Sequence, residues 1–324
     1  MTLTATGQES GGLRRTSTFM GWTRRIALLG LAAMLASASG VSARPGVVEE
    51  LPVGGAWSIE IDEEARRIYV LGDPGLVVLD ADSYEQLAEV DLPGNPSDLA
   101  HDTRRDLLFV SGRRHVSIID AESLALVRTK EMDGYKNLSP LAVDERTGLV
   151  YVGVYARKLI LVLDGDSLAE RDKVKLGSRY TSAYPTDVTV DPARHRLHVA
   201  DVDGYVHIFD TRTLEREATV RIGAWAEDGS FLALDREEGV LYATADNTLK
   251  ALDPVTGLRS WGSSLPTTPG RLALDGANGF LHIVTVPKAG MPGELLIVNV
   301  PKRRLEHRFE LVPGDEMYAN DVAV

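Results

Sequence analysis

The sequence predicts an all-β fold, a β-propeller of four-stranded blades with six complete blades and a partial seventh closed by the two chain ends. Two series of turn residues recur after residue 46 at a common spacing of about 44 residues. The first series comprises Asp62, Asp102, Asp144, Asp191, Asp235 and Asp275. The second lies 18 to 24 residues further along and comprises Asp80, Asp120, Asp164, Asp210, Asp253 and Asn299. Two markers with one period indicate a repeat architecture rather than a chance pattern.

Each repeat contains four short segments with strand character. In the fourth repeat these are 187–190, 196–200, 205–209 and 217–222, rich in β-branched residues and separated by turns that contain Asp, Gly and Pro. A single four-stranded sheet cannot bury both of its faces, so such sheets stack around an axis. We expect the recurring aspartates to form turns by accepting backbone N–H groups, and not to be catalytic.

The predicted organisation is one propeller domain over residues 44–324. Its expected blades are 57–92, 96–132, 138–176, 184–222, 228–265 and 269–311, with 318–324 and 47–53 forming the partial seventh. Residues 47–53 resemble the outer strand of a repeat, and 318–324 resemble an inner strand. Either the two ends make a minimal closing blade or the sequence stops short of the natural C-terminus. The ending at Asp321–Val324, where other repeats continue into a hairpin, favours the second alternative.

A family resemblance adds to this prediction. Segments 47–55, 67–70 and 148–153 (GLVYVG) resemble the bacterial YVTN-type propeller repeat, of the quinoprotein amine dehydrogenase-like superfamily. The resemblance covers nearly all of residues 47–324 and implies the fold without implying a function. Trp-Asp and Gly-His dipeptides are absent, which weighs against the WD40 class.

Residues 1–43 have the features of a signal peptide. Arg24 and Arg25 precede an apolar run of 11 residues, and small residues lead to a cleavage site after Ala43. The run is too short to cross a bilayer as an anchor, which takes about 20 residues. Residues 23–28 resemble a twin-arginine signal, while the ordinary secretory route stays open. We therefore expect a periplasmic or secreted protein with no transmembrane span after cleavage.

The composition limits the available chemistry. The chain has no cysteine, which excludes disulfides, thiolate metal ligands and a thiol nucleophile. Its net charge of −12 disfavours nucleic acid as a partner, because an acidic surface repels phosphate. We expect a monomer.

Candidate ligand-binding residues lie on the loops between the second and third strands and on the loops between blades, which gather on one face around the channel. They are Trp57, Arg113, Arg114, His115, Tyr155, Arg157, Lys158, Tyr184, Trp225 and Asn320. A wider set on the same loops includes Asp98, Asp187, Arg271 and Asp321.

Two groups of these candidates suggest a ligand chemistry. Residues 113–115 and 157–158 lie on equivalent loops of adjacent blades, where basic side chains could hold a carboxylate or phosphate. The alternative is a solvated basic patch. The second group is aromatic and comprises Trp57, Tyr135, Tyr155, Tyr180, Tyr184 and Trp225. It could stack on a ring-shaped ligand, or it could be ordinary packing under long loops.

No cofactor and no metal site is predicted. Asp201 and Asp203 could bind calcium, but the same pattern is a plain turn signature. His195 and His198 lie on a hairpin and lack zinc spacing. Residues 251–261 resemble the tryptophan-docking repeat of quinoprotein dehydrogenases, but only one of six repeats does so. The paired cysteines of those enzymes are absent, so pyrroloquinoline quinone is not expected.

The leading hypothesis is a binding or interaction protein that takes a small anionic or aromatic ligand, or a partner protein, at the channel face. No catalytic motif is present, and catalytic residues are unknown. The alternative is an enzyme of lactonase-like, lyase-like or quinoprotein-related type that uses Asp, Asn and His on that face. A third hypothesis is a surface scaffold that contacts partners through blade edges.

Overall fold

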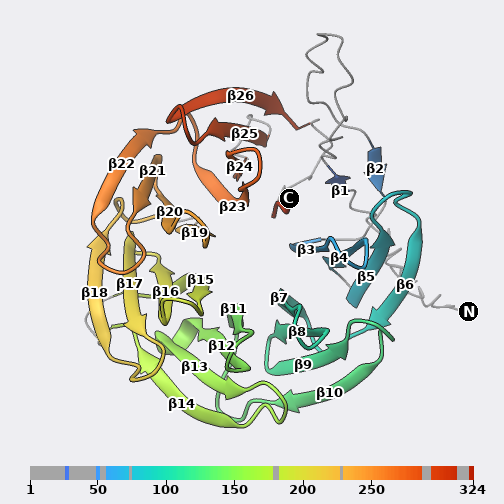
Figure 1. Cartoon of the computed structure of the whole chain (residues 1–324). Coiled ribbons are helices and arrows are strands. Elements are labelled where there is room, and N and C mark those ends of the chain that lie inside the picture. The colour runs from blue at the N-terminus through green and yellow to red at the C-terminus, as the bar shows by residue number, and fades with distance from the viewer. Residues whose placement is uncertain are drawn as a thin grey trace, which may run out of the picture.

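A computed structural model describes residues 26–28, 49–51, 56–72, 75–177, 182–226, 229–286, 293–311 and 321–324. Within them lie six four-stranded antiparallel sheets, each formed by four consecutive strands of the chain. The sheets stand around a common axis, with the first strand of each innermost and the fourth outermost (Figure 1). The predicted all-β propeller with six complete blades is therefore confirmed.

The 24 strands of these blades are short, with five to seven residues each. The first blade holds β3 (Ser58–Asp62), β4 (Arg67–Leu71), β5 (Gly75–Asp80) and β6 (Gln86–Asp91). The second holds β7 (Pro96–Asp102), β8 (Leu107–Gly112), β9 (His115–Asp120) and β10 (Leu126–Glu131). The third holds β11 (Leu138–Asp144), β12 (Leu149–Val154), β13 (Leu159–Asp164) and β14 (Glu170–Lys175). The fourth blade holds β15 (Pro185–Asp191), β16 (Arg196–Asp201), β17 (Tyr205–Asp210) and β18 (Arg216–Arg221). The fifth holds β19 (Phe231–Asp235), β20 (Val240–Ala245), β21 (Thr248–Leu252) and β22 (Arg259–Ser264). The sixth holds β23 (Pro269–Asp275), β24 (Phe280–Thr285), β25 (Glu294–Asn299) and β26 (Arg304–Glu310).

The recurring aspartates form turns, as the sequence predicts. Asp191 ends β15, and its Oδ1 accepts the backbone N–H of Arg194 at 3.0 Å. Asp210 ends β17, and its Oδ1 accepts the N–H of Arg212 at 2.8 Å. Because a carboxylate satisfies N–H groups that the hairpin leaves unpaired, the repeat of aspartates is a repeat of turns.

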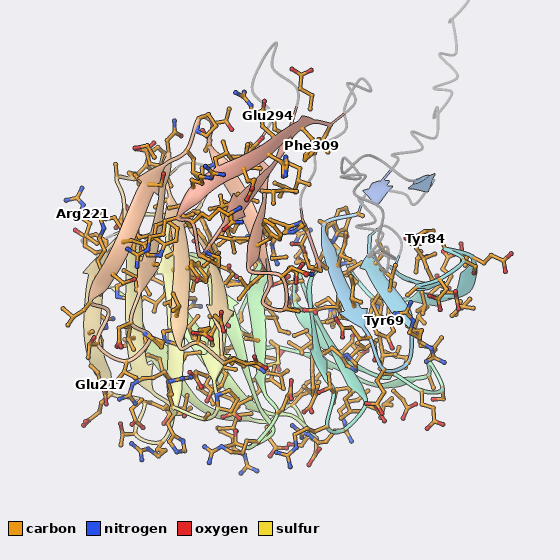
Figure 2. The ribbon with its side chains drawn as sticks, turned by 45° about the horizontal axis from the view of Figure 1, so that its top comes forward. Tyr69, Tyr84, Glu217, Arg221, Glu294 and Phe309 are labelled. Atoms are coloured by element: carbon orange, nitrogen blue, oxygen red, sulfur yellow. The ribbon has the colours of Figure 1, made fainter. Side chains whose placement is uncertain are left out.

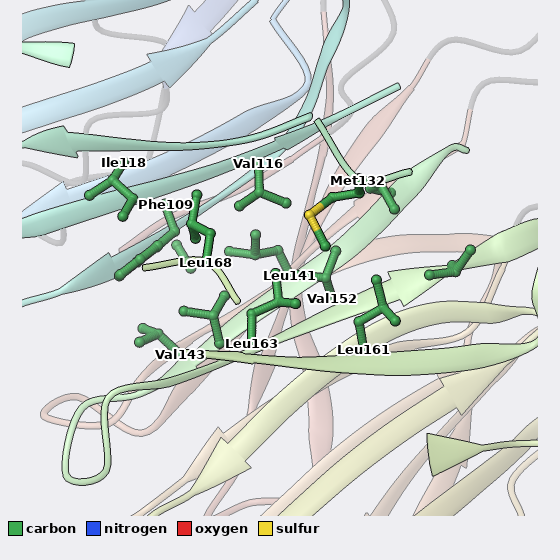
Figure 3. Packing of buried hydrophobic residues seen from close by; sticks show 14 of the residues in the cluster. Phe109, Val116, Ile118, Met132, Leu141, Val143, Val152, Leu161, Leu163 and Leu168 are labelled. Atoms are coloured by element: carbon green, nitrogen blue, oxygen red, sulfur yellow. The ribbon is translucent and has the colours of Figure 1, made fainter. Parts of the chain in front are cut away.

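The core lies between neighbouring blades and not within one sheet. Between the second and third blades, Phe109 and Ile118 pack against Leu141 and Val152 (Figure 3). The fourth strands face outward and are polar: Glu217 and Arg221 on β18 lie at the periphery of the molecule (Figure 2). Each blade therefore depends on its neighbours for burial, which favours a closed ring.

The junction between the last and the first blade differs from the other five. A partial seventh blade is not seen in the described residues: Asp321–Val324 forms no strand, and β2 (Glu49–Leu51) pairs with β1 (Ile26–Leu28) instead. Residues 47–48, 52–53 and 318–320 of the predicted seventh blade lie outside the described residues. Asp321 nevertheless reaches the first blade, because its Oδ2 accepts the N–H of Ile59 at 3.0 Å.

The same C-terminal segment also contacts the last blade. Val322 packs on the apolar cluster of that blade, which includes Leu295 and Ile297. Figure 1 shows the C-terminus at the inner wall, between β23 and β3. Four residues at the end of the chain thus connect its first and last sheets.

Helical structure in the described residues is confined to one 3-10 turn, η1 (Tyr155–Arg157). None of them forms a helix long and apolar enough to cross a membrane. Most of the predicted signal peptide, residues 1–25 and 29–43, lies outside the described residues, and export stays a prediction.

Candidate functional site

The inner strands bring one equivalent position from each blade to the inner wall of the ring. This position lies four residues before the aspartate that ends the strand. Asp321 of the C-terminal segment is the seventh member, because it accepts a backbone N–H of the first inner strand as Asp98 and Asp187 do from theirs. We call the set the inner ring; it consists of Ser58, Asp98, Pro140, Asp187, Phe231, Arg271 and Asp321.

Three aspartates of the inner ring connect adjacent segments in the same way. Asp98 Oδ2 accepts the N–H of Leu141 at 2.8 Å, and Asp187 Oδ2 accepts the N–H of Leu232 at 2.7 Å. The bond from Ile59 to Asp321 has the same form, since Ile59 is the residue of β3 that matches Leu141 and Leu232. Each aspartate therefore ties its own segment to the inner strand of the next blade.

Arg271 connects two of these aspartates across the ring. Its Nη2 donates to Asp98 Oδ1 at 2.9 Å, and its Nη1 lies 3.7 Å from Asp321 Oδ2. Ser58 also donates to Asp98 Oδ1, at 3.1 Å. Asp98 and Arg271 are 173 residues apart in the chain. This ion cluster joins the second blade, the sixth blade and the C-terminal segment.

Glu60 is a further carboxyl group of the first blade beside this cluster. It occupies a place on β3 where the other inner strands carry small residues, for example Ala100 and Ala233. Burial raises the pKa of Glu60 to about 8, and the negative charges of Asp321 and Asp98 add to the shift. Glu60 is therefore mostly protonated at neutral pH.

The pKa values of three inner-ring groups, Asp187, Asp321 and Arg271, are shifted by the same balance of burial and charge. Burial raises the pKa of Asp187 to about 7 and that of Asp321 to about 6, and in both cases Arg271 opposes the shift. Burial alone would lower the pKa of Arg271, but Asp98, Asp321 and Asp187 outweigh it and raise that pKa above its ordinary value. The guanidinium of Arg271 thus faces the carboxyl groups of Asp98, Asp187, Asp321 and Glu60.

A cavity of about 390 Å³ opens beside the other part of the inner ring. We call it the mouth pocket; it is lined by Ser97, Asn137, Ser139, Pro140, Tyr155, Pro185, Thr186, Val202, Gly229 and Phe231. These residues come from the starts of inner strands, from loops between blades and from loops between second and third strands. They are the loops on which the sequence predicts a ligand site.

Two glycines allow the walls of the mouth pocket to come close together. A Cβ on Gly153 of β12 would lie 2.5 Å from Pro140 Cδ, so only glycine lets Pro140 sit at this place in the floor. Gly229 has a φ of +103°, and a Cβ there would lie 3.2 Å from the ring of Phe231. A larger residue at either position would displace the floor.

Tyr155 is held in a fixed orientation at the edge of the mouth pocket. Its ring stacks on that of Tyr184, with centroids 4.6 Å apart and planes 14° apart. Tyr184 is anchored in turn, since its carbonyl accepts the N–H of Val202 at 3.0 Å. Tyr155 keeps 42% of its surface exposed, so it offers a pre-oriented aromatic face to a ligand.

The basic candidates do not converge on the mouth pocket. Arg114 pairs with Glu131 at 2.6 Å, and Arg157 donates to the carbonyl of Gly134 at 3.0 Å. Lys158 lies over the ring of Tyr184, 4.8 Å from its centroid. His115 begins β9 and lies beside Gly94.

Arg113 is exposed on the loop between β8 and β9, and its backbone bonds Asn95 and Asn137. Lys158 lies next to the aromatic pair of the pocket.

The aromatic candidates divide into different environments. Tyr155 lines the mouth pocket and Tyr184 stands behind it. Trp57 packs on the cluster between the first two blades, and Trp225 is 58% exposed on the loop that leads to Gly229. Tyr135 donates its hydroxyl to Glu170 at 3.1 Å. Tyr180 and Asn320 lie outside the described residues.

The acidic turn considered for calcium has other contacts. Asp201 accepts the N–H of Tyr205 at 3.0 Å and lies 2.8 Å from His207 Nε2, while Asp203 accepts the N–H of Ala183 at 2.9 Å. In the described part of the chain, no three His, Asp or Glu side chains are grouped so that they could hold a metal ion.

Comparison with solved structures shows the same architecture in other proteins. The chain is similar to the β-propeller domain of Myceliophteria thermophila Cps50 (Swd1), with a TM-score of 0.66 and 13% sequence identity over 79% of this chain and 86% of that one. It is also similar to a chain of a mitotic checkpoint complex, with a TM-score of 0.65 and 16% identity over 80% and 77%. No protein-family model and no curated protein matches the sequence. These likenesses establish the fold, and the YVTN-type family stays a prediction.

Proposed function

We propose that this chain is an exported β-propeller that acts as a binding or interaction protein through the mouth pocket. One observation carries the proposal: the stacked, 42% exposed ring of Tyr155 borders a cavity of about 390 Å³. The lining combines apolar side chains with a few hydroxyl and amide groups. This volume lies within the range of small-molecule sites.

A partner protein is the second type of occupant that the proposal includes. Trp225 is 58% exposed near the mouth pocket, and exposed aromatic residues are enriched in protein interfaces. One of the similar propellers is part of a mitotic checkpoint complex, which supports an interaction role.

A thermal-shift screen tests the proposed function. Sugars, lactones, quinones and aromatic amines, alcohols and acids would be added to the wild type and to Tyr155→Ala and Tyr135→Ala variants. A ligand of the native state raises the Tm of the wild type and of Tyr135→Ala, a tyrosine outside the pocket, but not that of Tyr155→Ala. An unchanged shift in Tyr155→Ala would refute the mouth pocket as the site.

The location and family belong to the same proposal. The features of residues 1–43 support export to the periplasm or medium, and segment 148–153 supports the YVTN-type family. Mass spectrometry of the exported protein should find Arg44 at the N-terminus. Recovery of the uncleaved chain in the cytoplasm would refute this part.

An enzyme of lactonase-like or lyase-like type is the second candidate, and Asp187 favours it. Asp187 follows the pocket residue Thr186, and burial raises its pKa to about 7, which suits general acid–base catalysis. Its two oxygens, however, accept the N–H groups of Val188 and Leu232, which supports a structural role. Turnover of a lactone that Asp187→Asn abolishes, with binding retained, would favour the enzyme.

A further inference from the structure

We propose that the mouth pocket binds an organic cation: an amine whose flat apolar body lies against Tyr155 and Phe231 and whose ammonium group points toward the inner ring. The inference rests on the proposed function and names its ligand class. It departs from the anionic ligand that the basic loops suggest in the sequence.

The lining of the mouth pocket is uncharged. Tyr155, Phe231 and two prolines, Pro140 and Pro185, supply apolar surface, and the polar lining residues are serines, a threonine and an asparagine. None of the ten lining residues can neutralise an anion by charge. A ligand carboxylate would gain no cationic partner from the lining.

Most charged residues that adjoin this lining in the chain are acidic: Asp98, Asp187, Asp201 and Asp203, against Lys136. Asp187 follows the lining residue Thr186 on β15, and Asp98 follows Ser97 on β7. The inner ring contains one cation, Arg271, and it is already engaged with Asp98 and with Asp321 on the far side. Glu60 is mostly protonated at neutral pH, but Asp98, Asp187 and Asp321 still outnumber this guanidinium. A cation beside Asp187 would also favour its ionised form, so a positive group entering from the pocket is favoured over a negative one.

Three basic side chains at the rim have partners of their own. Arg114 is paired with Glu131, and Arg157 donates to a backbone carbonyl. Lys158 rests on the ring of Tyr184, behind Tyr155. Arg113 and Lys136, which adjoin the lining residue Asn137, are exposed to solvent that screens their charges, so the more buried carboxyl groups of the inner ring dominate the sign of the charge that the pocket prefers.

The aromatic lining suits the same ligand. A cation over the face of a tyrosine ring is attracted by the negative π face, and the attraction grows where water is excluded. Tyr155 is fixed by its stack on Tyr184, so its face is oriented before the ligand arrives. Hydroxyl groups such as that of Ser139 can accept the N–H bonds of an ammonium group.

Three probes of similar size test the proposal by calorimetric titration of the full chain. Phenethylamine, 2-phenylethanol and phenylacetate share a benzene ring and differ in charge. We expect phenethylamine to bind at least about tenfold more tightly than 2-phenylethanol, with phenylacetate weakest. We call the ratio of the affinity for phenethylamine to that for 2-phenylethanol the advantage of the amine. Added salt should reduce this ratio without changing the affinity for the alcohol.

Two isosteric variants test which carboxyl group of the inner ring attracts the ammonium group. Asp187→Asn should reduce the advantage of the amine about three- to tenfold and leave the alcohol unchanged. Asp321→Asn is the matched control, because Asp321 makes the same bond to a neighbouring inner strand but lies on the other side of the ring. It should change the advantage less than Asp187→Asn does.

The outcomes separate the two proposals. Equal binding of amine and alcohol, or tighter binding of phenylacetate, overturns the cation inference; if Tyr155→Ala then abolishes binding of the alcohol, the proposed function stands. If Tyr155→Ala binds every probe as the wild type does, both are overturned. If no probe binds at millimolar concentration, the cation inference is overturned, and the thermal-shift screen then decides the proposed function.

Discussion

Arg271 and Phe231 hold equivalent places on neighbouring inner strands, yet the two sides of the inner ring are built differently. Arg271, Asp321, Ser58 and Asp98 form one arc, in which charged groups pair with one another across the ring. Pro140, Asp187 and Phe231 form the other arc, which borders the mouth pocket. We call them the ionic arc and the pocket arc. The comparison teaches that one repeated position can close the ring on one side and leave room for a ligand on the other.

Removal of the cation from the ionic arc should have the largest effect. Arg271→Met leaves Asp98 and Asp321 buried without their partner, which typically costs about 3–5 kcal/mol in the free energy of unfolding. Urea denaturation measures the loss. Arg66→Met, which breaks an exposed pair with Asp82, is the control and should show no comparable change. Equal stability of the two variants would show that the ionic arc does not hold the ring.

The bond that closes the ring should contribute less. Asp321→Ala removes the acceptor for the N–H of Ile59 together with the contact to Arg271, and we expect a loss of about 1–3 kcal/mol. Hydrogen exchange at the Ile59 amide should become faster in this variant. If exchange at Ile59 does not change, the C-terminal segment does not close the ring in solution.

The pH dependence of stability tests the raised pKa values of the carboxyl groups of the inner wall. The pKa values of Glu60, Asp187 and Asp321 are raised to about 8, 7 and 6, so the folded chain binds protons that the unfolded chain releases at about pH 4. Their contribution is therefore complete below that pH and decreases as the pH rises through 6 to 8. For each such carboxyl the slope is at most about 1.4 kcal/mol per pH unit.

Unfolding midpoints measured from pH 5 to 9 should therefore fall with pH, and Glu60→Gln should flatten the upper part of the curve. A midpoint that rises over this range, or a Glu60→Gln curve equal to that of the wild type, would contradict the assignment.

The smallest effect is expected at the basic loops. Arg114 and Arg157 are held by Glu131 and by the carbonyl of Gly134, outside the mouth pocket. Their joint replacement by alanine should leave the affinity for each phenyl probe within about twofold of the wild type. A large loss of phenylacetate binding in this variant would restore the anion hypothesis and weaken the distinction between the arcs.

The fold was predictable because its signal is local and repeated. Asp191 and Asp210 each bond backbone groups two or three residues further along, so their recurrence reveals the hairpins directly. The stack of Tyr155 on Tyr184 was partly predictable, since both lie on loops that a propeller brings to one face.

The ionic arc was not predictable in the same way. Arg271 and Asp98 meet only because the ring closes, and no local pattern connects residues 173 positions apart. Glu60 left a weaker signal: alignment of the repeats shows a carboxyl where the other inner strands carry alanine or threonine. The sequence also could not show that Glu131 holds Arg114, because that contact depends on how a side chain of the β8–β9 loop is placed beside the end of β10.

The most direct test of the two arcs measures two properties in the same two variants. The free energy of unfolding and the Kd of the phenyl probe that binds the wild type most tightly would be determined for Arg271→Met and for Tyr155→Ala. We predict that Arg271→Met is strongly destabilised but still binds the probe while folded, and that Tyr155→Ala keeps its stability and loses binding. Loss of binding in folded Arg271→Met, or full binding in Tyr155→Ala, would contradict the division of the inner ring.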